Sequence, residues 1–184
     1  MKKIPFDFTY SKYGLTCRLV REEDAAFILQ LRSDPKLSKY VHKIDNDLQG
    51  QIDWIREYKK REIRGEDYYF IYFSKNGPIG VNRIYNITET SSTSGSWICK
   101  KDSLIEESLA TSFILGEIMS LFEIHSGPFN VSRGNNHVLK FHLSMGAEVI
   151  GENEFEYTMR YNSEKYKLAK DKYIRLFNLK NETK

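Results

Sequence analysis

The stretch NNHVLKFHLSMGA, residues 135–147, carries the signals of a short helix with a defined beginning and end. Asn135 is a favourable N-cap residue, because its side-chain oxygen can accept a hydrogen bond from the amide of Val138. Apolar residues then recur at helical spacing on one face, and Gly146 is typical of the left-handed residue that ends a helix. On the inner side of this helix lies one ionisable residue, His142, and the pattern allows either packing or chemistry for it.

The remaining chain alternates between strand and helix signals. Short apolar or alternating runs bounded by turn residues predict strands, and apolar residues at helical spacing with capping signals predict helices. No element is predicted before Leu15. Strands are predicted at residues 15–20, 67–73, 79–87, 96–100, 129–132, 147–151 and 155–161. Besides the helix in the quoted stretch, helices are predicted at residues 21–34, 47–65, 105–122 and 163–180.

This order gives a three-stranded meander followed by a strand–helix–strand crossover. The polar run TETSSTSG, residues 88–95, is predicted to be a loop within the meander. Nearly continuous apolar and aromatic residues in DYYFIYF, residues 67–73, predict a central strand covered on both faces. The sequence therefore predicts an α/β fold in which helices cover a mixed sheet, built as a single domain over residues 1–184.

The composition of the 184 residues favours a folded globular domain, because 40% are hydrophobic and 14% are aromatic. The formal net charge is +3, from 28 basic and 25 acidic residues. So small a surplus argues against a dedicated nucleic-acid-binding protein, which usually has a concentrated basic face. A small anionic ligand fits this charge equally well.

The two cysteines, Cys17 and Cys99, form neither a disulfide framework nor a metal-ligand pattern. The N-terminal segment has two lysines but no apolar region behind them, and no run approaches the ~18 apolar residues of a membrane span. These observations predict a protein of the reducing cytoplasm that uses no metal and binds no membrane.

The quoted stretch resembles a motif of the GNAT superfamily of acetyl-CoA-dependent N-acetyltransferases. The motif runs from an Asn through a small or β-branched residue, an aromatic residue and a Tyr or His to a Gly and an apolar residue. The matching residues are Asn135, Val138, Phe141, His142, Gly146 and Ala147. CRLVREEDAAFILQLRSDP and QIDWIREYKKR resemble the family's first strand and helices, and KNGPIGVNRIYNI resembles a later hairpin. The resemblance spans about residues 15–160 and leaves a C-terminal helix, about residues 163–180, as an addition.

The resemblance implies a GNAT-like fold, whose sheet splays open beside its central strand, with acetyl-CoA as co-substrate. The pantetheine of acetyl-CoA would pair with the strand SWICK, and its pyrophosphate would lie at the start of the following helix. A backbone amide of this strand would hold the thioester carbonyl as charge develops on it. The implied cofactor-binding residues are Ile98, Cys99, Lys100, Glu107, Ser108, Leu109, Ala110, Thr111, Asn135 and Lys140.

The family's pyrophosphate-binding loop, Arg/Gln-x-x-Gly-x-Gly/Ala, is not matched by the corresponding segment KKDSLIEESLATSF. Such a loop binds phosphate because backbone amides at a helix N-terminus point at it and glycines allow close approach. The glycine positions fall on about Glu106 and Ser108, so Glu106 and Glu107 repel a pyrophosphate unless they point outward. Lys100 and Lys101 just upstream can restore the attraction. Acids in a first turn also have a structural explanation, since they complement the helix dipole.

His142 stands where the family commonly has a tyrosine that protonates the leaving thiolate. At an ordinary pKa of ~6.5, the neutral and the protonated imidazole are both accessible near neutrality, and each can donate a hydrogen bond. The resemblance implies a catalytic role, and pocket lining and packing are the alternatives. No general base is assigned: Glu22, Glu23 and Asp24 fit helix capping better, while Glu89 and a water relay stay open.

Arg32, His42 and Trp54 lie where the family binds its acceptor. Arg32 can bind a phosphate or carboxylate, and Arg32 and Trp54 are the predicted substrate-binding residues. The alternatives are a surface ion pair for Arg32, an exposed loop position for His42 and a core aromatic for Trp54. A nucleophilic role for Cys99 is weighed against inert packing, which an apolar strand without a positioned partner favours.

The resemblance thus implies an enzyme that moves an acetyl group from acetyl-CoA to a primary amine of a small molecule, with an amino-sugar nucleotide as the favoured acceptor. An acetyltransferase acting on protein or ribosomal-protein N-terminal amines is one alternative, and a non-catalytic GNAT-fold domain is another. The basic C-terminal helix is predicted to be a solvated face packed on the domain or on the second subunit of a homodimer.

Overall fold

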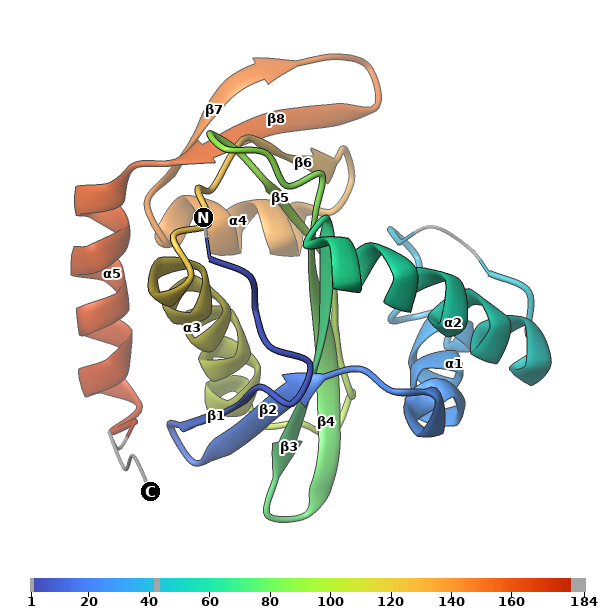
Figure 1. Ribbon diagram of the computed structural model, residues 1–184. Coiled ribbons are helices and arrows are strands. Elements are labelled where there is room, and N and C mark those ends of the chain that lie inside the picture. The colour runs from blue at the N-terminus through green and yellow to red at the C-terminus, as the bar shows by residue number, and fades with distance from the viewer. Residues whose placement is uncertain (1, 42–43, 180–184) are drawn as a thin grey trace.

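The computed structural model describes residues 2–41 and 44–179, arranged as two sheets with surrounding helices (Figure 1). The first sheet holds β1 (Thr9–Lys12), β2 (Leu15–Leu19), β3 (Asp67–Ser74), β4 (Gly77–Tyr85) and β5 (Thr93–Cys99). The second sheet holds β6 (Phe129–Ser132), β7 (Ala147–Glu152) and β8 (Glu156–Tyr161). A 3₁₀ turn, η1 (Glu22–Asp24), precedes the helices α1 (Ala25–Ser33), α2 (Leu48–Arg64), α3 (Ile105–Leu121), α4 (Asn136–Ser144) and α5 (Ser163–Leu176).

The strand order is β1-β2-β3-β4-β5 in the first sheet and β6-β8-β7 in the second. α1 and α2 cover one face of the first sheet, α3 covers the other, and α5 lies outside α3 (Figure 1). Within the described residues no ladder joins β5 to β6, and each pairing is antiparallel. Where the family resemblance implies that the sheet splays beside its central strand, the described residues form two separate sheets. The predicted mixed sheet would need a parallel pairing between β5 and β6, and this pairing does not form.

β3 confirms the prediction of a central strand covered on both faces. Tyr68, Phe70 and Tyr72 are buried in the cluster that includes α3, whereas Tyr69 and Ile71 are buried with α1 and α2. Because side chains alternate between the two faces of a sheet, apolar burial on both faces requires a continuous apolar run.

β1 and the start of β5 differ from the prediction. The sequence does not predict β1, because TYSK is a short, partly polar edge strand; its order comes from pairing with β2, from Thr9 opposite Arg18 to Lys12 opposite Leu15. β5 begins at Thr93, inside the polar run predicted to be a loop. Tertiary pairing overrides local sequence preference at both places.

Gly95 shows why a polar run forms part of β5. It pairs with Arg83 on β4, and a Cβ atom at Gly95 would lie 3.0 Å from the hydroxyl oxygen of Tyr85. The glycine therefore makes room for an aromatic ring lying over the strand, and does not mark a loop.

α4 begins after Asn135 and ends at Ser144, with Gly146 just beyond the C-cap residue, as predicted, but its N-cap differs in detail. Asn135 occupies the N-cap position without a side-chain hydrogen bond to the helix, so the predicted bond to the Val138 amide does not form. Gly146 has φ +83°, and a Cβ atom there would lie 2.6 Å from Lys165 Cβ and 2.8 Å from the Tyr166 nitrogen. Gly146 is needed both for its backbone conformation and for the close approach of α5.

α5 packs on the domain, in agreement with one of the two predicted arrangements. Tyr166, Ile174 and Phe177 pack against the core that contains α3, while Leu168 is 70% exposed and lies outside this buried face. No helix in the described part of the chain is long and apolar enough to cross a membrane.

Glu117 on α3 accepts hydrogen bonds from four side chains. Tyr10 and Tyr13 donate from the β1–β2 hairpin at 2.6 and 2.7 Å. Lys12 of the same hairpin and Lys170 of α5 donate at 2.9 and 2.7 Å. The Lys170 and Glu117 side chains are each only 17% exposed, so this carboxylate joins three elements in a largely water-excluded place.

Replacing Glu117 by Gln should lower the free energy of unfolding by about 2–4 kcal/mol, because the amide group would face converging donors and leave two lysines without their counter-charge. Urea denaturation measures this loss. Glu57→Gln is the matched control, since Glu57 forms an exposed pair with Lys60 and its loss should cost about 0.5 kcal/mol or less. Equal effects of the two substitutions would contradict the assignment.

The same carboxylate predicts the acid limb of stability. Burial would raise the pKa of Glu117, but hydrogen bonds from Lys170, Tyr10, Tyr13 and Lys12 outweigh it and lower the pKa to about 2. Its stabilisation is complete above the unfolded-state pKa of about 4.3 and is lost as the pH falls toward 2. Glu117→Gln should therefore show a shallower loss of stability over this interval than the wild type.

Candidate functional site

The break between β5 and β6 is walled by aromatic side chains. The rings of Trp97 on β5 and Phe141 on α4 lie 5.1 Å apart. Trp97 donates a hydrogen bond from Nε1 to Thr111 on α3 at 2.9 Å, and the Thr111 hydroxyl donates to the carbonyl oxygen of Ser108 at 2.7 Å. Thr111 is fully buried, so this predicted cofactor-binding residue fixes the wall through Trp97.

The backbone of β5 narrows the predicted cofactor-binding set. The Lys100 amide donates to the Ile79 carbonyl oxygen at 2.7 Å, and Ile98 is paired with Val81, so both residues direct backbone groups toward β4. By the alternation of an antiparallel ladder, the amide and carbonyl of Cys99 point the other way, toward the break. Of the three residues of β5 expected to pair with pantetheine, Ile98 and Lys100 thus direct their backbone groups into the first sheet, and Cys99 is the one whose backbone groups face the break.

A bulge in β5 lies next to these groups. The register with β4 shifts between Val81 and Arg83, and Ser96 on the longer side has φ +51°, which is uncommon for a residue other than glycine. Bulges bend a strand and increase its twist, so the bulge turns the end of β5 away from a straight ladder.

The N-terminus of α3 is capped by one of its own acids. The Glu107 carboxylate accepts a hydrogen bond from the Leu104 amide at 3.2 Å, which is the reciprocal bond of a capping box. This places negative charge on an amide that a phosphate at the helix N-terminus would use. The position of Glu107 thus follows the structural explanation for acids in a first turn.

Two lysines stand beside this turn. Lys100 has its ammonium nitrogen 5.8 Å from the ring centroid of Phe27 on α1. A cavity of about 250 Å³ lies between the end of α1 and the start of α3. Its lining comprises Gln30, Leu31, Asp34, Leu37, Lys100, Lys101 and Asp102. The predicted compensating lysines therefore share one cavity, together with two aspartates.

The start of α4 is tied to the segment between α1 and α2. The hydroxyl of Tyr40 donates to the Gly134 carbonyl oxygen at 2.8 Å. Asn135 follows directly and is half-buried, whereas Lys140 is exposed. Of these two predicted cofactor-binding residues, Asn135 therefore precedes the short helix α4 and Lys140 lies on its exposed side.

His142 pairs with Tyr161, a residue outside the motif of the quoted stretch. Its Nδ1 atom lies 2.6 Å from the hydroxyl oxygen of Tyr161 at the end of β8, and the ring centroid of Phe129 on β6 is 4.6 Å away. Burial lowers the pKa of His142 to about 4. The imidazole is therefore neutral at pH 7, and the expectation that both forms are accessible near neutrality is wrong.

Tyr161 carries a weak signal in the sequence. Tyr157, Met159 and Tyr161 alternate along EYTMRY, which indicates one shared face of a strand, and Met159 on that face is fully buried. Which helix this face meets depends on the register of β8 with β6 and β7, and local sequence does not determine that register.

Trp54 is not a core aromatic. It is 37% exposed, and its ring stacks on Tyr58 at 5.8 Å and meets the edge of Tyr69 at 5.9 Å. The guanidinium groups of Arg61 and Arg83 lie over it at 5.6 and 5.2 Å from the ring. Trp54 is therefore a surface aromatic held between cations.

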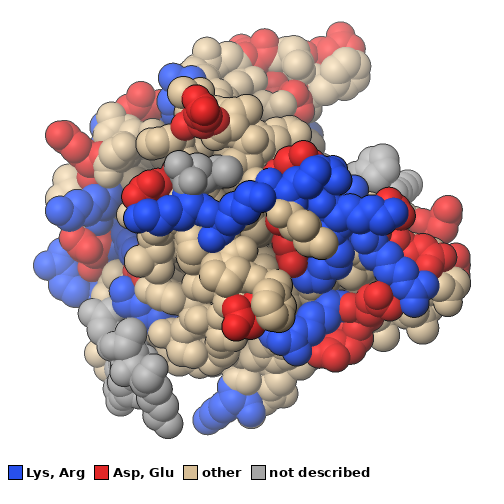
Figure 2. Space-filling view, in the orientation of Figure 1, with Lys and Arg blue, Asp and Glu red and all other residues tan. Residues whose placement is uncertain are grey.

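The surface around Trp54 carries basic side chains on one side, while the arginines next to the ring are paired with an acidic residue. Figure 2 shows Lys and Arg side chains gathered over the C-terminal part of α2. Beside them a cavity of about 340 Å³ is lined by Arg61, Glu66, Asp67, Arg83, Tyr85, Asn86, Ile87 and Thr88. Asp67 is 2% exposed and accepts hydrogen bonds from Arg61 and Arg83, so much of their charge is already neutralised.

Arg32, the other predicted substrate-binding residue, is half-buried on α1. Burial raises the pKa of the nearby Tyr69 hydroxyl, and the Arg32 guanidinium opposes this rise. The Arg32 guanidinium therefore lies close to an aromatic residue of β3. His42 lies outside the described residues.

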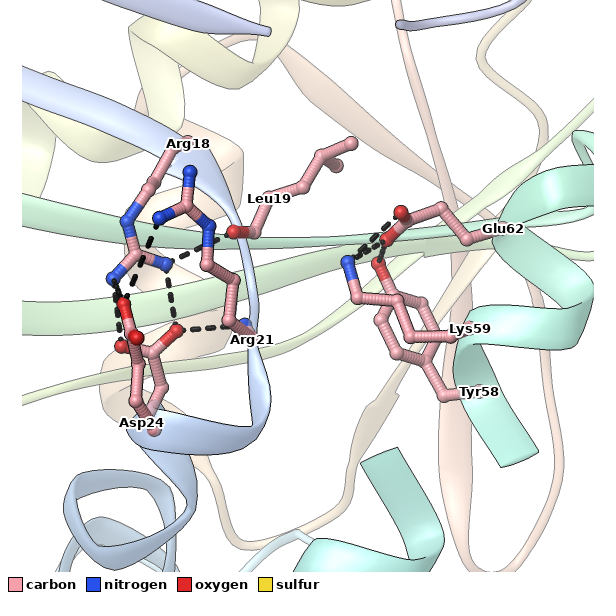
Figure 3. Close-up of polar contacts among 8 residues, drawn as sticks. Arg18, Leu19, Arg21, Asp24, Tyr58, Lys59 and Glu62 are labelled. Carbon is pink, nitrogen blue, oxygen red and sulfur yellow. Dashed lines mark hydrogen bonds and ion pairs between the residues drawn. The ribbon is translucent and has the colours of Figure 1, made fainter. Parts of the chain in front are cut away.

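The acids after β2 have structural roles. Asp24 is buried and accepts two hydrogen bonds from Arg18, at 2.7 and 2.9 Å, and one from the Arg21 amide at 2.7 Å (Figure 3). Glu23 pairs with Arg18, and Glu22 pairs with Arg56. Helix capping and ion pairing therefore account for all three former candidates for a base.

Tyr58 fixes α2 to the sheet. On the helix itself it donates a hydrogen bond to Glu62, which Lys59 neutralises at 2.8 Å (Figure 3). From β3, the Tyr69 amide donates to the Tyr58 hydroxyl oxygen at 2.8 Å. These contacts hold the helix that carries Trp54 in place.

Cys99 agrees with inert packing. Burial raises the pKa of its thiol, outweighing hydrogen bonds that would lower it, and its Sγ lies 3.9 Å from the Thr111 hydroxyl oxygen. A thiol held protonated in this way is a poor nucleophile.

Comparison with known proteins identifies the family. No protein-family model matches the chain, and no curated protein matches it in sequence. Among solved structures, the chain is similar to the apo form of FdhC, a nucleotide-linked sugar GNAT, with 36% identity and a TM-score of 0.80 over 92% of this chain and 98% of that one.

Two more distant structures share the fold. A Vibrio cholerae spermidine N-acetyltransferase in complex with CoA and spermine has 16% identity and a TM-score of 0.68, over 83% of this chain and 98% of that one. A ribosomal-protein alanine acetyltransferase from Vibrio fischeri has 16% identity and a TM-score of 0.69, over 86% and 98%. With the FdhC similarity extending over nearly the whole of both chains, this protein belongs to the GNAT superfamily of N-acetyltransferases.

Proposed function

We propose that the protein transfers an acetyl group from acetyl-CoA to the primary amine of a nucleotide-linked amino sugar. The observation that carries this proposal is the 36% identity to a nucleotide-linked sugar GNAT, sustained over 92% of this chain. The break between β5 and β6 is the place for the pantetheine, and the amine acceptor enters on the side of α1 and α2.

Three features of the break support this assignment. The Cys99 backbone points into it, and a backbone amide there can stabilise the oxyanion that forms when an amine attacks the thioester. The Trp97 and Phe141 rings supply an apolar wall that excludes water. His142 is neutral, and its Nε2 has no hydrogen-bond partner among the described residues, so this atom is open to meet the sulfur.

At the start of α3, the phosphates of acetyl-CoA would lie near both positively and negatively charged side chains. Lys100 and Lys101 attract them, and Glu107 at the Leu104 amide repels them. Because the glycine loop is replaced by a capped helix, affinity depends on the lysines more than on backbone amides.

Acetyl-CoA at about 100 times its Kd should raise the Tm by roughly 5–10 °C, because a ligand that binds only the folded state adds about 2.7 kcal/mol of stability. Glu107→Gln keeps the capping hydrogen bond and removes the charge, so it should tighten binding by about fivefold. Glu57→Gln makes the same charge change on α2 and serves as the control. No thermal shift at about 1 mM acetyl-CoA would refute the enzyme assignment.

The acceptor is identified by thiol release with a panel of primary amines. Amino-sugar nucleotides should support turnover, while spermidine and peptides with N-terminal alanine should support at least tenfold less, corresponding to about 1.4 kcal/mol of discrimination. Preference for the peptide would support the ribosomal-protein alternative. Acetyl-CoA binding without turnover on any of these acceptors would favour a non-catalytic domain.

His142→Phe should lower kcat by about 100-fold while the Kd for acetyl-CoA changes by less than about threefold, because only the transition state needs the lost hydrogen bond. Isothermal titration and steady-state kinetics on the same preparation separate the two effects. Unchanged turnover would return His142 to a packing role.

A further inference from the structure

The hydrogen bond between His142 and Tyr161 leaves the two ring nitrogens in different situations. Nδ1 lies 2.6 Å from the Tyr161 hydroxyl oxygen, whereas Nε2 has no hydrogen-bond partner among the described residues. The imidazole is otherwise surrounded by the rings of Phe129, Phe141 and Tyr161. In the described part of the chain, no carboxylate or cation is bonded to it.

The chemistry of the two groups decides where the proton lies. A phenol is a stronger hydrogen-bond donor than a neutral imidazole N–H, and an imidazole nitrogen is a stronger acceptor than a phenol oxygen. The favoured bond therefore runs from the Tyr161 hydroxyl to the Nδ1 lone pair. A neutral imidazole carries one proton, so that proton must then be on Nε2.

We propose that Tyr161 is a positioning residue that holds His142 as the neutral Nε2–H tautomer, so that His142 donates a hydrogen bond to the leaving sulfur and does not act as a protonated acid. This inference rests on the proposed function for the identity of the sulfur. The tautomer itself follows from the geometry of the pair.

The step then balances without a proton from the enzyme. The amine nitrogen attacks the thioester carbonyl carbon, the C–S bond breaks and its electron pair goes to sulfur. The Nε2–H bond stabilises the thiolate but stays intact, and the new amide nitrogen loses its surplus proton to water. The thiolate leaves and takes a proton from water in solution.

Full proton transfer from the pair is disfavoured on both sides. If Nε2 gave up its proton, either an imidazolate or, after transfer from Tyr161, a tyrosinate would remain in this half-buried site among aromatic rings. Burial and the neighbouring Tyr166 raise the pKa of Tyr161, and burial holds His142 neutral. The pair is therefore built to orient a donor and to remain uncharged.

The tautomer is measured by two-bond ¹H–¹⁵N correlation spectra of the full chain with ¹⁵N-labelled histidine, recorded without any ligand. The chain has 4 histidines, and the His142→Gln variant assigns the signals of His142. His142 should be entirely Nε2–H in the wild type down to about pH 5, whereas His137, exposed on the same helix, should show a tautomer mixture. A protonated Nδ1 in the wild type at neutral pH would overturn the proposal.

Tyr161→Phe removes only the hydroxyl and should turn the His142 signals into a tautomer mixture. It should also lower kcat by about tenfold, with the KM for acetyl-CoA within about twofold. Tyr166→Phe is the matched control, because the Tyr166 ring lies 5.1 Å from Tyr161 and its hydroxyl is not bonded to His142; this variant should resemble the wild type. Unchanged histidine spectra in Tyr161→Phe would overturn the role of Tyr161.

The histidine spectra and the acetylation kinetics distinguish a failure of the proposed function from a failure of the role of Tyr161. If the tautomer is as expected but the wild type acetylates no amine, the proposed function is overturned and the tautomer assignment stands. If the wild type is active but Tyr161→Phe equals Tyr166→Phe in both spectra and kcat, the role of Tyr161 is overturned and the function stands. If Tyr161→Phe does not fold, the wild-type spectrum still decides the tautomer.

Discussion

The break between β5 and β6 is the constraint on which the rest of the structure depends. An edge strand with unpaired backbone groups must be covered or used, since it otherwise pairs with other chains. Here the second sheet stands beside β5 without joining it, because contacts on either side set the spacing. The Trp97 ring meets Phe141, and the Tyr40 hydroxyl reaches the carbonyl of Gly134. Among the described residues, the Cys99 amide and carbonyl that point away from β4 thereby have no strand partner on that side.

α5 holds the helices that border this break, although it follows the residues, about 15–160, that carry the family's sequence motifs. Lys170 in its middle binds Glu117 of α3, and its first turn packs against Gly146 at the end of α4. The same Glu117 binds the β1–β2 hairpin. One helix therefore fixes the relative positions of α3 and α4, and those helices carry the side chains that face the break.

The sequence predicts those elements of the fold whose buried residues recur with the spacing of a strand or a helix. The apolar run of β3, the buried face of α3 and the Asn-to-Gly frame of α4 each give a local signal. Contacts made by tertiary pairing give none: β1 depends on β2, and the first residues of β5 depend on Gly95 lying under Tyr85. The residues of the candidate site also differ in whether a local sequence signal predicts them. His142 was predictable from its place in a helix, whereas Tyr161 is separated from it by a hairpin whose register no short segment encodes.

The match of α4 to the family's motif is weaker support for catalysis than it first looks, because packing alone explains most of it. Gly146 is required by its backbone angle and by α5, and Phe141 is required by Trp97. A domain without activity would need both. His142 differs, since an apolar residue would fill its position among aromatic rings at no desolvation cost. A half-buried imidazole with one nitrogen bonded to a tyrosine and the other left open is costly for packing, and it is what a fixed hydrogen-bond donor requires. The evidence for a catalytic role of this helix is therefore the hydrogen-bonded pair of His142 and Tyr161, and the sequence motif accounts only for the position of His142.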